Sequence, residues 1–308
     1  MTVQTIDPVR RQRRPDRAAW EEPESAVGRT AKTIVLTLVV LSVAFPLWTV
    51  AVTSISSRKT INETGGMVVI PRDLDLSAYI TIFSGGQVTN AVWVSTLVSV
   101  VGAAFSLTLT VMAAYGLSRP NSVAHRTILF YFLLTFLIYP GMVPSYLVVT
   151  AFGLKDNIWA LVLPSAISAF NLVVVRAFFM NVPQELLDSA RLDGASEWGI
   201  LWRIVLPLSK AVIAVVGLFY AVTYWNAFFT ALLYIDDNDK WPVQRLLQSY
   251  ILAGQSPNVS GSTVGASMPP TLAIKMAVVV ITVAPIVAVY PFVQRHFVKG
   301  VIVGAVKG

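Results

Sequence analysis

The stretch from residue 91 to residue 118 reads AVWVSTLVSVVGAAFSLTLTVMAAYGLS and contains no charged residue. A helix of about 20 apolar residues crosses a bilayer core of about 30 Å, so this stretch is long enough to span a membrane. Its apolar character is continuous, without the alternation that is typical of a barrel strand. The stretch therefore predicts a transmembrane α-helix.

Five further stretches of the same kind predict an all-α membrane protein with six transmembrane helices. The expected spans cover residues 34–55, 91–118, 127–152, 158–180, 205–235 and 272–292. The composition agrees, because only 13% of the 308 residues are charged, whereas a soluble domain has about 25%. The chain contains no cysteine, which excludes disulfides and cysteine metal sites.

The basic residues predict the orientation of these spans. If both termini are cytoplasmic, 16 of the 23 Lys and Arg residues fall on the inner side of the membrane. Cytoplasmic loops carry such an excess, so the distribution predicts a multi-pass protein with cytoplasmic N and C termini. The arginines that precede residue 32 alternate with Pro and Glu, which indicates a disordered tail rather than a partner of nucleic acid.

Several kinds of site are missing from the sequence. No Asp or Glu falls inside an expected span, although ion-driven carriers usually place such residues at mid-membrane. His125 and His296 have no partner at metal-ligand spacing. Phosphate-binding loops of the GxxxxGK[ST] type and the HExxH and GxSxG motifs are absent. We therefore expect no catalytic, cofactor or metal site in this chain, and energy for uphill transport must come from another subunit.

The predicted inner connection between the fourth and fifth spans covers residues 181–207 and reads NVPQELLDSARLDGASEWGILWRIVLP. Asn181 is a candidate N-cap, with Pro183 in the first turn of a short helix. Gly194 is expected to end this helix in a left-handed conformation. A second helix is expected to begin near Ser196 and to run to a break at Pro207. The first helix is expected to be amphipathic, with its charges on one side and four apolar residues mostly on the other: Leu186, Leu187, Ala190 and Leu192.

This connection resembles the cytoplasmic coupling loop of binding-protein-dependent ABC importer permeases. The pattern of that family is Glu-Ala-Ala, three residues, Gly and later Ile-x-Leu-Pro. Here Asp188-Ser189-Ala190 stands for the triplet, Gly194 for the glycine and 204–207 for the tail. The run 192–195 and the ending 290–308 resemble the carbohydrate branch of the family, which is the maltose or oligosaccharide type.

The resemblance implies a type I ABC importer permease fold and a set of partners. It implies a second homologous permease subunit, a cytoplasmic ATPase dimer and an extracytoplasmic solute-binding protein, in a bacterial-type plasma (inner) membrane. ATP and Mg would bind to the partner ATPase subunits, so this chain would be a transport subunit and not an enzyme. The residues that the resemblance assigns to ATPase coupling are Glu185, Asp188, Ser189, Ala190, Asp193, Gly194 and Pro207.

The expected domain organisation follows from the spans and the loop. We expect a cytoplasmic tail over 1–31, a first transmembrane helix over 32–56 and an outer loop over 57–90. A permease core over 91–298 contains the coupling loop 181–207, and a cytoplasmic tail covers 299–308. By resemblance, the outer segments 56–90 and 236–270 reach toward the solute-binding protein.

The spans also contain candidates for close helix contact and for a transport path. Five small residues recur every fourth position along the second span and favour close helix contact: Gly102, Ser106, Thr110, Ala114 and Ser118. Aromatic faces and amide or hydroxyl groups suit sugar rings, so a polar cluster is a candidate lining for the path. This cluster consists of Asn171, Tyr220, Thr223, Tyr224, Trp225 and Asn226. Hydrogen bonding between helices explains the same cluster equally well.

The function expected from these features is a permease subunit of an ATP-driven importer for a sugar, an oligosaccharide in particular. Two alternatives stay open: an ion-coupled secondary carrier and an ABC importer permease for a solute that is not a sugar. An intramembrane enzyme or assembly scaffold is disfavoured because no nucleophile and base, and no metal-ligand set, occur together.

Overall fold

The structure, a computed structural model, describes residues 26–119, 124–138, 140–251 and 271–305. Its longer helices are α1 (Ala26–Ser54), α4 (Gln87–Ser118), α5 (His125–Leu137), α6 (Met142–Ala151), α7 (Ala169–Met180), α11 (Lys210–Trp225) and α14 (Thr271–Ala305). The shorter ones are α2 (Arg58–Glu63), α3 (Ser77–Ser84), α8 (Gln184–Leu192), α9 (Glu197–Ile200), α10 (Leu206–Leu208), α12 (Phe228–Tyr234) and α13 (Val243–Ile251). Turns of 3-10 helix form η1 (Ile158–Leu161), η2 (Leu163–Ser165) and η4 (Asn238–Lys240), and η3 (Leu201–Val205) is a π-helix. Within these described ranges, extended pairing is limited to one bridge between Ser56 and Leu74.

The chain divides into two units after Trp48. The described part of the first unit is helical and belongs to α1, which has an apolar window of mean hydropathy 2.4. The second unit begins at Thr49 and contains all the other helices. Of the predicted tail over 1–31, residues 1–25 lie outside the described part of the chain, and residues 26–31 belong to α1.

The predicted spans are helical, but three of them are broken. Over the described residues, α1, α4 and α14 are each long and apolar enough to cross a membrane, and three bent pairs of helices raise the total to as many as six spans. In the fourth predicted span, the segment 158–165 meets α7 at an angle of 54°. Pro164 lies in this segment and has no N–H group to donate to a continuous helix. The fifth predicted span is interrupted after Trp225, where α11 ends and a new helix, α12, begins at Phe228.

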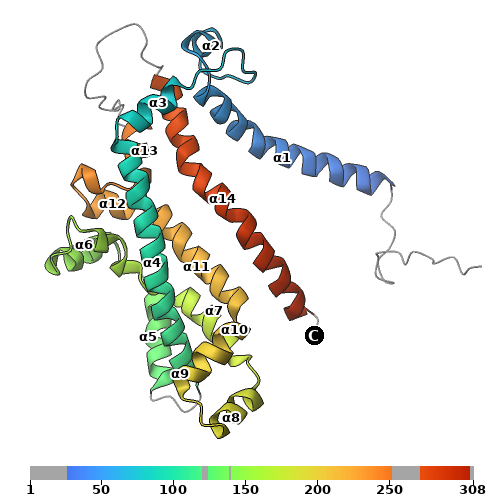
Figure 1. The fold of residues 1–308 in the computed structure, drawn as a ribbon, viewed down its shortest axis with the longest axis vertical. Helices are drawn as coiled ribbons and strands as arrows, with labels where there is room; N and C mark the ends of the chain where they lie inside the picture. The colour runs from blue at the N-terminus through green and yellow to red at the C-terminus, as the bar shows by residue number, and fades with distance from the viewer. Residues whose placement is uncertain (1–25, 120–123, 139, 252–270, 306–308) are drawn as a thin grey trace, which may run out of the picture. The chain divides into compact units, whose positions relative to one another are not determined.

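Helix α4 is the centre of the second unit. It packs against α11 and α7, and α11 packs in turn against α14 (Figure 1). The small-residue face predicted on this helix makes the contact with α11. Tyr224 lies over Gly102, and the hydroxyl groups of Ser106 and Tyr224 are 2.6 Å apart. The prediction of close helix contact along this face is therefore confirmed.

The predicted outer segment 236–270 is helical in part. Residues 243–251 form α13, which buries Leu246 and Tyr250 and packs against α4 and α14. The backbone N–H of Val243 donates to Ser95 Oγ of α4 at 2.8 Å. A helix forms here because the apolar residues of α13 recur at helical spacing and can pack on one side. Residues 252–270 lie outside the described part of the chain.

We predict that Gly102→Ala destabilises the protein. A Cβ atom at this position would lie 2.9 Å from Cδ2 of Tyr224 and 3.1 Å from Cγ2 of Val162, and the Tyr224 ring is fully buried. Overpacking of this kind costs about 1–3 kcal/mol, which thermal unfolding of the detergent-extracted protein would detect as a lower Tm. Gly116→Ala in the same helix is the matched control, because its Cβ would meet nothing within 4 Å. Equal Tm values for the two variants would contradict the proposed contact.

Candidate functional site

The first helix of the coupling loop, residues 181–207, begins at Gln184, after the start that the predicted cap at Asn181 would give it. Asn181 is the C-cap of α7, since its backbone is helical and its N–H donates to Phe178 O at 3.2 Å. Pro183 stands at the N-cap of α8, directly before the first helical residue, Gln184. The prediction that Asn181 caps α8 is therefore wrong. Glu185 does lie in the first turn of α8, where a carboxylate is stabilised by the helix dipole.

Helix α8 ends in the left-handed turn that Gly194 predicted. Gly194 has a φ of +81°, and its N–H donates to Arg191 O at 3.0 Å. The N–H of Ala195 reaches back to Ala190 O at 2.9 Å, so two carbonyl groups at the end of the helix are satisfied. A Cβ atom at Gly194 would meet nothing within 4 Å. The backbone angle, and not a lack of space within the chain, is what requires glycine here.

The second helix of the loop also begins where expected. Ser196 caps α9, because its Oγ accepts the N–H of Gly199 at 3.2 Å. The helix continues through the π-turn η3 and through α10, which contains Pro207, and the chain bends by 86° before α11. The predicted break near Pro207 is therefore confirmed, although the helix ends at Leu208, one residue later.

Three of the four apolar residues of α8 lie on one side of the helix. Leu186, Leu187 and Ala190 fall within about 100° of one another at the helical spacing of about 100° per residue, and Leu192 falls on the other side. Leu187 is buried and Ala190 is half-buried, whereas Leu186 is exposed and Leu192 is 90% exposed at the end of the helix. The prediction that these residues fall mostly to one side is therefore confirmed, with Leu192 as the exception. The acidic residues of the loop are exposed as well: Glu185, Asp188, Asp193 and Glu197.

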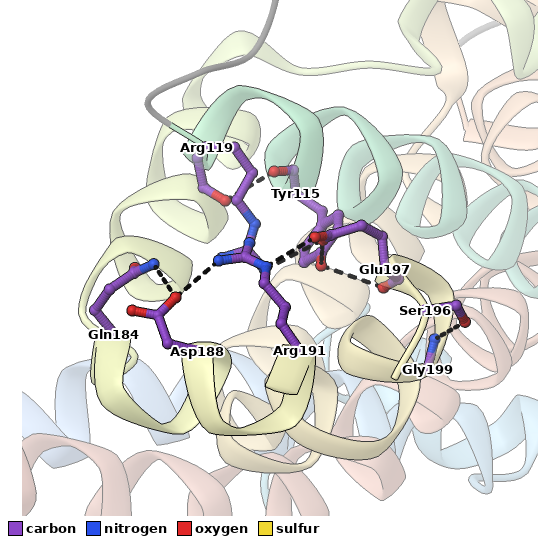
Figure 2. Close-up of polar contacts among 9 residues, drawn as sticks. Tyr115, Arg119, Gln184, Asp188, Arg191, Ser196, Glu197 and Gly199 are labelled. Carbon is purple, nitrogen blue, oxygen red and sulfur yellow. Dashed lines mark hydrogen bonds and ion pairs between the residues drawn. The ribbon is translucent and has the colours of Figure 1, made fainter. Parts of the chain in front are cut away.

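A chain of polar contacts ties α8 to α9. Figure 2 shows Arg191 between two carboxylates: its Nη1 donates to Asp188 Oδ1 at 3.0 Å and its Nε to Glu197 Oε1 at 3.1 Å. These hydrogen bonds, the one to Glu197 first, raise the pKa of the Arg191 guanidinium. Gln184 Nε2 donates to the same Asp188 oxygen at 3.3 Å. Arg191 therefore holds the two short helices as one unit.

The same loop contacts the end of α4. Tyr115 donates its hydroxyl to Glu197 Oε2 at 2.5 Å, and the Arg119 guanidinium lies 4.4 Å from the centre of the Tyr115 ring (Figure 2). Arg119 Nη2 is 4.0 Å from Glu197 Oε2. The sequence analysis did not include Tyr115, Arg119, Arg191 or Glu197 among the site residues. Tyr115 and Glu197 are 82 residues apart, and no local pattern joins them.

The remaining predicted coupling residues lie on the surface of this loop. Ser189 Oγ donates to Glu185 O at 2.8 Å, which is a bond within the helix, and Asp193 is the C-cap of α8. Together with Asp188 and Gly194, they form one exposed end of the fold, while Ala190 is half-buried behind it. Their role toward an ATPase stays a prediction at this point.

The predicted path residues fall into two groups. Tyr220 and Tyr224 are buried and bond to other helices: the hydroxyl of Tyr220 is 2.7 Å from Thr110 Oγ1, and that of Tyr224 also donates to Val162 O at 3.3 Å. Trp225 is buried too and donates its indole N–H to Thr282 O, at 3.1 Å, on α14. Contacts between helices therefore use these three side chains, and their part in a path stays a prediction.

The other predicted path residues are placed differently. Thr223 and Asn226 are exposed, and Asn226 Oδ1 accepts from Gln244 Nε2 at 3.3 Å. Asn171 is buried in the first turn of α7, where its backbone N–H bonds to Ser168 Oγ at 3.4 Å. Thr223 Oγ1 donates to Phe219 O at 2.7 Å and Asn226 Nδ2 to Val222 O at 3.0 Å, both within the same stretch of chain, and the part of these residues in a path stays a prediction.

A second polar cluster, which the sequence analysis missed, lies where the turn after α6 meets the turn after α12. Asp156 Oδ1 accepts the backbone N–H groups of Asp236 and Asp237 at 3.1 and 3.0 Å. Lys240 Nζ donates to Asp156 O at 3.0 Å and lies 3.5 Å from Asp156 Oδ2, and Lys155 pairs with Asp236 at 3.0 Å. The hydrogen bond from Asp237 is the main cause that lowers the pKa of Asp156. We call these five residues the Asp156 clasp.

Comparisons with known proteins cover most of the chain. Residues 106–303 match the family described as "Binding-protein-dependent transport system inner membrane component". The chain is 45% identical over 242 residues to the polygalacturonan/rhamnogalacturonan transport system permease protein YtcP of Bacillus subtilis (strain 168), which covers 78% of this chain and 85% of that one. It is also 45% identical over 240 residues to protein LplC of the same organism, with coverage of 78% and 81%. A crystal structure of a bacterial ABC transporter involved in the import of the acidic polysaccharide alginate contains a chain with TM-score 0.84 and 27% identity, covering 90% of this chain and 100% of that one.

We predict a graded effect of substitutions at Asp156. This residue has a φ of +60°, which Asn and Gly tolerate better than Ala. Asp156→Asn keeps an acceptor for the two N–H groups, Asp156→Gly keeps only the backbone angle, and Asp156→Ala loses both. We expect amide hydrogen exchange at Asp236 and Asp237, measured by mass spectrometry, to be slowest in Asp156→Asn, faster in Asp156→Gly and fastest in Asp156→Ala. Equal exchange in all three variants would contradict the clasp.

The clasp should also depend on pH, because folding lowers the pKa of Asp156. The stabilisation by the Asp156 carboxylate is full above its ordinary pKa of 3.8 and is lost as the pH falls through the lowered pKa.

Proposed function

Because this chain belongs to the family of inner membrane components of binding-protein-dependent transport systems, we propose that it is one of two permease subunits of an ATP-driven importer. The family match covers both the coupling loop and the contact between α4 and α11. The importer would be completed by a homologous second permease, two ATPase subunits in the cytoplasm and a solute-binding protein outside. ATP and Mg would be held by the ATPase subunits, with no cofactor on this chain.

The observation that carries the proposal is the exposed end of the coupling loop. Leu192 is 90% exposed beside the exposed carboxylates of Asp188 and Asp193. Three further large apolar side chains of the loop are exposed, Leu186, Trp198 and Trp202, and a group of exposed apolar side chains favours a protein contact. A helix that lies on anionic lipid would instead carry Lys and Arg on its polar face. These features support docking of α8 into a groove on an ATPase.

The proposed cargo is a carbohydrate, and an oligosaccharide in particular. One relative is named for polygalacturonan and rhamnogalacturonan, and the structural relative takes part in the import of alginate, an acidic polysaccharide. A screen of cargo should therefore begin with fragments of such polymers and include neutral oligosaccharides and solutes that are not sugars. An excess of basic residues on one side supports cytoplasmic termini.

The first test is the recovery of partners. We expect that the C-terminally tagged chain, crosslinked in native membranes and extracted, brings down an ATPase, a second permease and a solute-binding protein, as identified by mass spectrometry. Solute uptake should require ATP and should not change when ionophores dissipate the proton gradient. Recovery of the chain alone, with uptake that follows the proton gradient, would instead support an ion-coupled secondary carrier.

The same experiment tests the docking surface through Leu192→Asp. We expect this variant to insert normally and to lose most of the ATPase, because a carboxylate would be desolvated in the proposed groove. Leu74→Asp is the matched control, since Leu74 is also a highly exposed leucine, at 74%, in the predicted outer segment. Full ATPase recovery with Leu192→Asp would contradict docking through this end of α8.

A second prediction concerns Gly194. Gly194→Val forces a β-branched residue into a φ of +81° and should distort the turn between α8 and α9. We expect normal insertion with loss of ATPase retention or of uptake. Gly194→Asn is the control, because Asn tolerates the left-handed region and should retain more of both. Wild-type retention and uptake in Gly194→Val would remove this turn from the coupling mechanism.

A further inference from the structure

Glu197 is the point at which the coupling loop and α4 meet. On the loop side, Arg191 Nε donates to Glu197 Oε1 at 3.1 Å and fixes the carboxylate relative to α8. On the α4 side, Tyr115 donates its hydroxyl to Oε2 at 2.5 Å, and also approaches the backbone carbonyl of Glu197 at 3.2 Å (Figure 2). One carboxylate thus receives hydrogen bonds from two segments that are far apart in the sequence.

Arg119 stands next to this carboxylate but does not yet bind it closely. Its side chain is only 16% exposed, and its Nη2 is 4.0 Å from Glu197 Oε2. This is well beyond the 2.7–2.9 Å or so of a charge-assisted hydrogen bond. Its Nε and Nη2 are buried and have no hydrogen-bond partner among the described residues. Because an arginine stays charged and its buried donors are costly to leave unpaired, a closer approach of Glu197 would be favourable.

The end of α4 is also connected to the remainder of the bundle. Arg176 of α7 donates its Nε to Leu117 O at 2.8 Å. Further along α4, Thr110 and Ser106 bond to Tyr220 and Tyr224 of α11. A displacement of the end of α4 would therefore also displace α7 and α11, because both helices pack against α4.

We propose that Glu197 is the joint through which the coupling loop moves α4, with Tyr115 and Arg119 as positioning residues. Arg191 keeps α8 and α9 together, so the loop moves as one unit when an ATPase closes on it. Glu197 then approaches Arg119, and the shortening of this ion pair from 4.0 Å makes α4 follow the loop. This inference rests on the proposed function. It states that α4 is the first membrane helix to move when the loop is displaced, although it is α11 that follows the loop directly in the chain.

The test uses the complete importer in lipid vesicles with its solute-binding protein, and compares Arg119→Gln, Arg119→Lys and Glu197→Gln. We expect Arg119→Gln and Arg119→Lys to retain the ATPase and its basal hydrolysis. Uptake per ATP hydrolysed should fall on the order of tenfold in Arg119→Gln, a typical size for a coupling between two sites. Arg119→Lys keeps the charge and should retain more uptake. Arg126→Gln, which removes an exposed arginine of α5, is the matched control and should behave as wild type.

A double-mutant cycle decides whether the two side chains act together. If they form one joint, Arg119→Gln combined with Glu197→Gln should lower uptake per ATP no further than either single change. Additive losses, or normal uptake in Arg119→Gln, would overturn the proposal. Loss of the ATPase from Glu197→Gln would overturn it as well, because Glu197 would then serve docking. Failure of the proposed function is a separate result, since the wild-type chain would then retain no ATPase or take up solute without ATP.

Discussion

The absence of water in the bilayer core governs this structure, because polar groups there must find partners within the protein. The contact between α4 and α11 meets this requirement with two tyrosines. Tyr224 lies over Gly102 and bonds to Ser106, while Tyr220 bonds to Thr110 and receives the N–H of Ser168 at 3.0 Å. The small residues of α4 thus provide both the space for the rings and the partners for their hydroxyl groups.

The coupling loop follows a different rule, because it must keep its shape while it is exposed. Its shape depends on the backbone turn at Gly194 and on Arg191, which bridges Asp188 and Glu197. Single ion pairs at a surface contribute little to stability. Here they fix the orientation of two short helices, and the apolar Leu192 stays exposed. The loop is therefore built to present a surface as well as to fold.

The sequence predicted the features that depend on local residues. Gly194 and Ser196 predicted the turn and the second helix of the loop. Small residues at every fourth position predicted the side of α4 that contacts another helix closely. The cap at Asn181 was wrong, because Pro183 sets the start of α8 and Asn181 still belongs to the end of α7. Contacts between distant segments, such as Tyr115 with Glu197 and Asp156 with Asp237, have no local signal. They follow from the three-dimensional arrangement of helices, which a single sequence does not display.

The π-turn over Leu201–Val205 has a consequence for how such proteins tolerate changes in length. A π-turn holds one residue more than the same stretch of α-helix and absorbs it within a single turn. The downstream chain therefore keeps the phase that a regular helix one residue shorter would give it. An insertion or deletion in the regular part of α11 would instead rotate the residues that follow by about 100° and turn its tyrosines away from α4. The π-turn is thus a place where the length of the chain between the loop and the span can change by one residue without a change of register.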